Sequence, residues 1–113
     1  GGVRACLRLA EEVGLPVVVS SALESSVGIA AGLALAAALP ELPYACGLAT
    51  VALLEQDTVP APLLPRDGHL PATAPPPSEE SLAAVAAPPA VHERWTARWR
   101  SVAQLAAEQG GQA

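Results

Sequence analysis

The sequence of 113 residues has no Lys, no Met and no Phe, and only three aromatic residues, Tyr44, Trp95 and Trp99. Without Lys, these residues cannot supply a lysine general base, a Schiff base or the lysine of a phosphate-binding loop. Because Met is absent, position 1 is not a translation start, and we expect a processed product or a fragment. The length allows one domain at most.

Positive charge is also scarce, since all six basic residues are Arg and the net charge is −5. This argues against a nucleic-acid partner, because binding to a phosphate backbone requires clustered cations. The longest apolar run, Val27 to Leu39, has 13 residues. It is shorter than the roughly 20 residues that span a bilayer, so no membrane partner is expected. Cys6 and Cys46 lack metal-type spacing, and we expect both to be buried core residues of a protein in a reducing compartment.

The first half of the sequence alternates between helical and extended patterns. Val3 to Val13 has apolar residues at helical spacing, and Gly14 is placed to end that helix in the left-handed conformation. Val17 to Val19 and Tyr44 to Leu48 are short strand candidates on either side of a second helix. This order predicts an α/β fold with parallel strands.

The second helix is expected over Val27 to Leu39. It carries no charged residue, and a helix that is apolar all round belongs in the interior of a larger body. Ser21 and Glu24 have the spacing of a capping box, and Ser25 is another candidate N-cap.

The second half is rich in proline, with seven of the 12 prolines between Pro60 and Pro77. Asp67-Gly68 predicts a turn in this extended segment. A short helix capped by Ser78 is expected to reach about Ala87, and a last helix to run from Pro89 to about Ala107. A packing stripe of the last helix comprises Val91, Trp95, Trp99, Val102 and Leu105.

A candidate site lies at the turn after the first strand. Ser20 and Ser21 would stand at the carboxyl edge of a parallel sheet, where ligands bind. The start of the following helix suits a carboxylate or phosphate, although these serines could also serve only as caps. Gly47 holds the matching position after the second strand and permits close backbone approach.

Other constellations have simpler interpretations. A nucleophilic serine would need His69 or His92, and no nucleophile elbow is present. Glu24 is expected to cap rather than to act as a base or metal ligand. Glu55 and Asp57, two residues apart after the second strand candidate, could contact a cation, but a solvated loop is the better interpretation.

Several segments together resemble a known family. They are LPVVVSSALESSVG at 15–28, AAALP at 36–40 and CGLAT at 46–50, behind a GGVR-initiated helix. The chain is similar to the C-terminal part of o-succinylbenzoate synthases of the enolase superfamily, in the form found in high-GC actinobacteria. The resemblance covers nearly the whole chain.

The resemblance implies a modified (β/α)₇β TIM-like barrel with a capping domain. Residues 1–57 would be the last barrel units, in the order helix, strand, helix and strand. Residues 58–113 would be a Pro-rich tail with two helices, returning toward the capping domain. The missing N-terminal part of the barrel and the capping domain would then be the partners of this chain.

The family dehydrates 2-succinyl-6-hydroxy-2,4-cyclohexadiene-1-carboxylate to o-succinylbenzoate in menaquinone biosynthesis. By resemblance, Mg²⁺, its three acidic ligands and both catalytic lysines belong upstream, so this chain would hold no catalytic residue and no metal ligand. Ser20, Ser21 and Gly47 would line the carboxylate substrate. The isolated chain is therefore expected to be inactive and at best loosely folded. The alternatives are an N-acylamino acid racemase or dipeptide epimerase of the same superfamily, and a non-catalytic binding module with its own fold.

Overall fold

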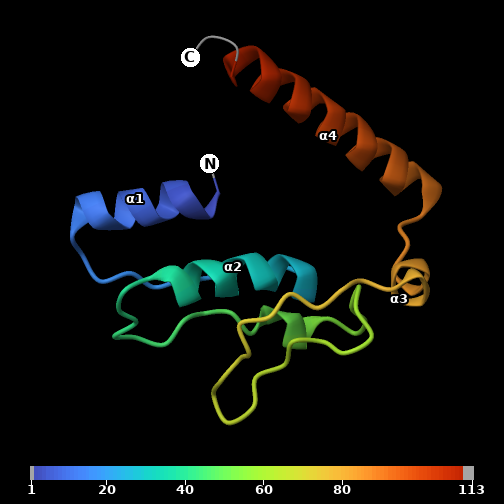
Figure 1. Cartoon of the computed structure of the whole chain (residues 1–113). Coiled ribbons are helices and arrows are strands. Elements are labelled where there is room, and N and C mark those ends of the chain that lie inside the picture. The colour runs from blue at the N-terminus through green and yellow to red at the C-terminus, as the bar shows by residue number, and fades with distance from the viewer. Residues whose placement is uncertain (1, 111–113) are drawn as a thin grey trace.

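The structure, a computed structural model, describes residues 2–110, with side chains to residue 108. Its elements are α1 (Val3–Val13), α2 (Ser26–Ala38), the 3₁₀ helix η1 (Thr50–Leu53), α3 (Glu79–Ala84) and α4 (Pro89–Gly110). Figure 1 shows α1 and α2 side by side and running in the same direction, with an extended segment returning after each. The expected alternation of helical and extended segments is therefore present.

The two expected strands, Val17 to Val19 and Tyr44 to Leu48, are not formed. Residues 2–110 contain no strand, and the two segments meet only in one parallel bridge, between Ser20 and Gly47. The predicted parallel orientation is correct at this bridge, but residues 2–110 do not form the predicted sheet. Two short extended segments gain too little from pairing with each other to form a stable sheet without further strands.

The ends of α1 and α2 follow from local sequence. Gly14 has the left-handed conformation predicted for it, with φ 65°, and its N–H donates to the carbonyl of Ala10. Helix α2 starts one residue earlier than expected, with Ser25 as its N-cap. The predicted capping box is wrong, because Ser21 lies too far before this start. Glu24 instead accepts a hydrogen bond from the N–H of Ala22.

The core lies beneath one face of α2. Its buried hydrophobic residues are Val19, Ile29, Leu33, Ala36, Leu48, Val51 and Leu63. Gly32 allows the close approach, because a Cβ there would lie 2.8 Å from Leu48 Cδ2. The opposite face of α2 is open, and Val27 is 45% exposed. Residues 2–110 therefore cover only one face of α2, and its place in the interior of a larger body stays a prediction.

The Pro-rich segment forms a loop with one tight turn. Arg66 and His69 pair in an antiparallel bridge around Asp67 and Gly68, which have φ 49° and 76°. The turn predicted from Asp67-Gly68 is confirmed, since glycine and aspartate tolerate positive φ. Helix α3 is capped as expected, with Ser78 Oγ accepting from the N–H of Ser81 at 3.0 Å.

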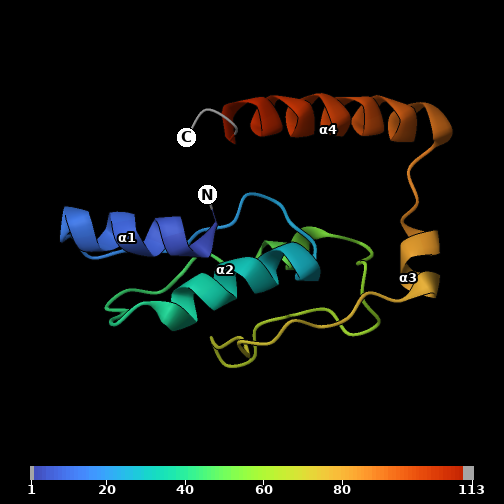
Figure 2. The same ribbon diagram turned by 45° about the horizontal axis from the view of Figure 1, so that its top comes forward.

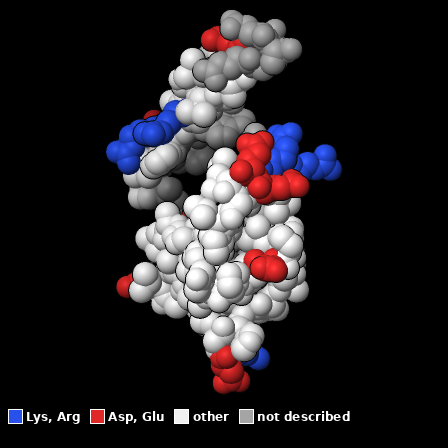
Figure 3. All heavy atoms as spheres, turned by 90° about the vertical axis from the view of Figure 1, so that its left-hand side faces the viewer, with Lys and Arg blue, Asp and Glu red and all other residues white. Residues whose placement is uncertain are grey.

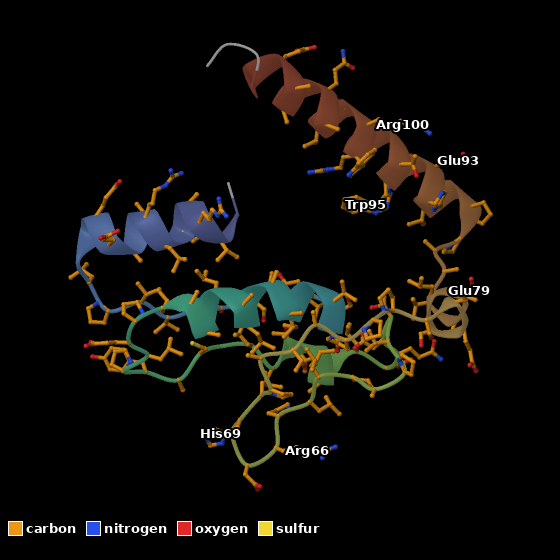
Figure 4. All side chains as sticks on the ribbon, viewed as in Figure 1. Arg66, His69, Glu79, Glu93, Trp95 and Arg100 are labelled. Carbon is orange, nitrogen blue, oxygen red and sulfur yellow. The ribbon has the colours of Figure 1, made fainter. Side chains whose placement is uncertain are left out.

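Helix α4 stands apart from the remainder of the chain, joined to it through α3 (Figures 1 and 2). The radius of gyration is 16.6 Å, against about 13 Å for a compact domain of this length. The predicted packing stripe is largely exposed in the described part of the chain, since Trp95 is 56% and Trp99 71% exposed. Figure 4 shows Trp95 on the side of α4 toward the body of the chain and Arg100 on the opposite side.

Apolar surface is abundant across the chain. Among the described residues, sixteen large hydrophobic side chains are exposed, whereas eight hydrophobic residues are buried, the seven of the core and Val59. Charged side chains gather in a few places on the face seen in Figure 3, which leaves much of the lower body uncharged.

The burial predicted for Cys6 is wrong, since Cys6 is exposed, whereas Cys46 is half-buried. None of the described helices combines the length and apolarity needed to cross a membrane.

Candidate functional site

The candidate site is built on the bridge between the two extended segments. The N–H of Gly47 donates to the carbonyl of Val19, and the N–H of Ser21 donates to the carbonyl of Gly47, both at 2.9 Å. Ser20 lies between these two bonds. The structure thus brings together Ser20, Ser21 and Gly47, the three residues that the sequence singled out.

The two serines differ in their surroundings. The Ser21 hydroxyl is half-buried and lies 3.0 Å from the carbonyl oxygen of Gly47 and 2.8 Å from Thr50 Oγ1. Ser20 is exposed, and the one hydrogen bond that its hydroxyl makes to another described residue is 3.4 Å long, to the carbonyl of Ser21. That distance is beyond the normal range for a hydroxyl donor. Ser20 is therefore free to donate to a ligand.

Gly47 leaves room for the Ser20 hydroxyl. A Cβ at position 47 would lie 3.0 Å from Ser20 Oγ. Both backbone polar groups of Gly47 are used within the bridge, so its N–H already has an acceptor. The contribution of Gly47 to a ligand site is thus open space rather than a free donor.

The N-terminus of α2 holds a carboxylate from the chain itself. Asp57 is buried, with 8% of its surface exposed, and accepts hydrogen bonds from Ser26 N at 3.1 Å and from Ser26 Oγ. Thr58 N donates to the same carboxylate at 2.7 Å. Burial alone would raise the pKa of Asp57, but the hydrogen bonds from Ser26 and Thr58 together hold it below its ordinary value. Asp57 supplies the negative charge that a helix N-terminus favours, so a ligand anion has no access to the N–H of Ser26.

The same hydrogen-bond network connects the Pro-rich segment to the start of α2. Ser26 Oγ accepts a hydrogen bond from the N–H of Leu63 at 2.8 Å. The expectation of a solvated loop is therefore wrong for Asp57, while Glu55 is exposed as expected. The hydrogen bonds of Ser26 with Asp57 and Leu63 fix the end of the turn from Ser20 to Ser26, and the bridge to Gly47 fixes its start.

The remaining titratable groups do not build a second site. His69 Nδ1 lies 2.7 Å from the carbonyl of Asp67, in the exposed turn at the bottom of Figure 4. No hydrogen bond between the described residues joins a histidine to Ser20 or Ser21. Glu24 has one carboxylate oxygen on Ala22 N, and its other is buried without a hydrogen-bond partner. In the described part of the chain, no group of three or more His, Cys, Asp or Glu side chains could hold a metal ion.

Two residues of the site were missed from the sequence. Thr50 contacts Ser21 across 29 positions, and Asp57 contacts Ser26 across 31. The only local signal was the position of Thr50, three residues after Gly47. The sequence pointed to Asp57 only as a possible cation contact and not as a partner of Ser26, because a carboxylate in a loop is normally solvated.

Known proteins are similar to this chain over most of its length. Residues 1–77 match the family described as enolase C-terminal domain-like. The o-succinylbenzoate synthase of Thermobifida fusca is 65% identical over 98 residues, which are 87% of this chain and 30% of that protein. Those of Mycobacterium tuberculosis and Mycobacterium leprae are 49% identical over 105 residues, which are 93% of this chain and 32% and 31% of those proteins.

The chain therefore spans about a third of the length of these relatives. The family match covers the two helices α1 and α2, the bridge and the Pro-rich segment, and so includes every residue of the candidate site. On this match, the chain belongs to the enolase C-terminal domain-like family.

Proposed function

We propose that this chain is the C-terminal part of an o-succinylbenzoate synthase, a Mg²⁺-dependent lyase of menaquinone biosynthesis. The observation that carries the proposal is the 65% identity to the Thermobifida fusca relative over 98 residues. Residues 1–57 are then the last units of a (β/α)₇β barrel, and residues 58–113 the tail toward the capping domain. The parallel bridge between Ser20 and Gly47 is consistent with two adjacent barrel strands that end at one edge.

The reaction removes water from 2-succinyl-6-hydroxy-2,4-cyclohexadiene-1-carboxylate. The C–H bond next to the ring carboxylate breaks and its proton passes to a base. The ring C–O bond then breaks, the hydroxyl leaves with the bonding electrons, and the ring becomes aromatic. This chain has no Lys to act as the base. By the resemblance to the family, both the base and the metal ligands belong to the rest of the protein.

The role of this chain is to form part of the substrate wall. Ser20 is the residue that donates to a substrate carboxylate, because its hydroxyl is exposed and has no strong partner. Gly47 keeps the space above that hydroxyl open. In this proposal Ser21 does not donate to the substrate and only supports the residues that line it. The free cysteines Cys6 and Cys46 suit a reducing compartment, so we assign the reaction to the cytoplasm.

A chimera tests this function. In the chimera, this chain replaces the matched segment of the Thermobifida fusca relative, and o-succinylbenzoate formation is followed by its absorbance in the presence of Mg²⁺. We expect activity within about tenfold of the parent relative, and none from the isolated chain. A folded chimera without activity, beside an active parent, would refute the proposal.

The role of Ser20 has its own test within the chimera. We expect Ser20→Ala to raise KM by about fivefold, the factor that corresponds to one lost hydrogen bond. Ser101→Ala removes an equally exposed hydroxyl from α4 and is expected to leave KM unchanged. An unchanged KM in Ser20→Ala would exclude Ser20 from substrate binding.

A further inference from the structure

The hydroxyl groups of Ser21 and Thr50 form a hydrogen-bond chain with a fixed direction. Ser21 Oγ is 3.0 Å from the carbonyl oxygen of Gly47 and 2.8 Å from Thr50 Oγ1. A hydroxyl has one proton to donate, and a carbonyl oxygen can only accept. Ser21 therefore donates to Gly47, and Thr50 must donate to Ser21.

This direction leaves Ser21 with no proton for a ligand. The carbonyl oxygen of Gly47 is also saturated, because it accepts from both the N–H and the hydroxyl of Ser21. Thr50 has in turn given its single proton to Ser21. Three hydroxyls lie next to the bridge, those of Ser20, Ser21 and Thr50. Of these, only the hydroxyl of Ser20 keeps a proton for a ligand.

The single bridge makes these side-chain bonds important. The two extended segments pair only at Ser20 and Gly47, with no neighbouring ladder among the described residues to hold their register. Thr50 begins η1 and is half-buried there, so its hydroxyl approaches Ser21 from a short, ordered helix. It is bonded to the half-buried Ser21, whereas Ser20 is exposed.

We propose that Thr50 is a positioning residue, which acts through Ser21 to hold the spacing between Ser20 and Gly47. The inference rests on the proposed function for its catalytic readout, but not for its structural one. Loss of the Thr50 hydroxyl leaves Ser21 bonded to Gly47 alone. The bridge then loosens, and Ser20 is presented less well to the substrate carboxylate.

In the chimera, Thr50→Val removes the hydroxyl at nearly constant volume. We expect KM to rise by about fivefold, the factor of one hydrogen bond, with kcat within about twofold. Thr50→Ser keeps the hydroxyl and should restore KM to within about twofold. Thr73→Val removes an exposed threonine hydroxyl from the Pro-rich segment and is the matched control, with no change expected.

A double-mutant cycle tests the route through Ser21. If Thr50 acts through Ser21, Thr50→Val should add no further change in KM once Ser21→Ala is present. Independent, additive effects would overturn the inference, as would an unchanged KM in Thr50→Val or a defect in Thr50→Ser as large as that in Thr50→Val.

Amide hydrogen exchange in the folded chimera gives a readout without catalysis. The Ser21 N–H donates to Gly47, and we expect it to exchange about fivefold faster in Thr50→Val and unchanged in Thr50→Ser. An inactive chimera would defeat the proposed function, while this exchange result would still decide the role of Thr50. Equal exchange of Ser21 in the parent chimera and in Thr50→Val would overturn the inference.

Discussion

Asp57 is expected to hold the Pro-rich segment against α2, and its replacement should release that segment. Asp57→Ala removes the acceptor for Ser26 N, Ser26 Oγ and Thr58 N in a buried position. The Ser26 hydroxyl already accepts from Leu63 N–H, so after the substitution its own proton has no acceptor. The loss therefore spreads to Leu63, six residues further along the chain.

The size of the effect follows from these bonds. A lost N-terminal cap costs about 1 kcal/mol, and each buried donor left without a partner costs about 1–3 kcal/mol. Relief from burying the charge of Asp57 offsets part of this sum. We therefore expect a net local loss of about 2 kcal/mol, which corresponds to about 30-fold faster opening. Asp57→Asn keeps an acceptor for Ser26 N and should lose about half as much free energy.

The measurement is amide hydrogen exchange of Leu63, which reports local opening without requiring cooperative unfolding of the whole chain. We expect about 30-fold faster exchange in Asp57→Ala at neutral pH. Glu55→Ala removes an exposed carboxylate two residues away and is the matched control, with unchanged exchange expected. Equal protection of Leu63 in the parent and in Asp57→Ala would refute the reasoning.

The pH dependence gives a second check with a fixed sign. Hydrogen bonds lower the pKa of Asp57 in the folded chain below the ordinary value of 3.8. The stabilisation is therefore fully present well above pH 3.8 and is lost as the pH falls through the lower, folded pKa. The ratio of Leu63 exchange rates between Asp57→Ala and parent, taken at equal pH, should decline only in that acidic range. A ratio that does not depend on pH there would contradict an ionised Asp57.

Three further substitutions test the packing of the fold and the candidate site at the bridge between Ser20 and Gly47. In the chimera, Gly32→Ala places a Cβ 2.8 Å from Leu48 Cδ2, and we expect a loss of about 1–3 kcal/mol in the free energy of unfolding; an unchanged melting temperature of the chimera would contradict the packing described. Gly47→Ala crowds the rotatable hydroxyl of Ser20, so in the chimera KM should rise by about fivefold with little change in stability. The reverse pattern would show that Gly47 serves the fold instead. Ser78→Ala removes the side-chain cap of α3 and should weaken that helix by about 1 kcal/mol, seen as smaller helical Cα chemical shifts over residues 79–84.

The helices could be predicted from the sequence because their signals are local. The apolar spacing of Val3 to Val13, together with Gly14, placed α1 correctly. The start of α4 at Pro89 and the cap of α3 by Ser78 were likewise encoded in a few consecutive residues. The strands were predicted wrongly, because a strand depends on neighbours that residues 2–110 do not supply.

The edge where the site lies was also predictable. Ser20, Ser21 and Gly47 meet there because an alternating helical and extended pattern brings the ends of parallel segments together. The different roles of Ser20 and Ser21 could not be predicted, since both serines look alike in the sequence. It depends on Thr50, which approaches Ser21 but not Ser20.

By itself, the sequence determined the composition limits and the local structure of this protein. It excluded lysine chemistry, located the helices and pointed to the turn beginning at Ser20. The tertiary structure alone decided which hydroxyl keeps a free proton and which anion fills the N-terminus of α2. The physical reason is that both outcomes depend on hydrogen bonds between distant positions of the sequence. Thr50 is 29 positions from Ser21, and Asp57 is 31 positions from Ser26. The path of the chain sets such contacts, and no local spacing encodes them.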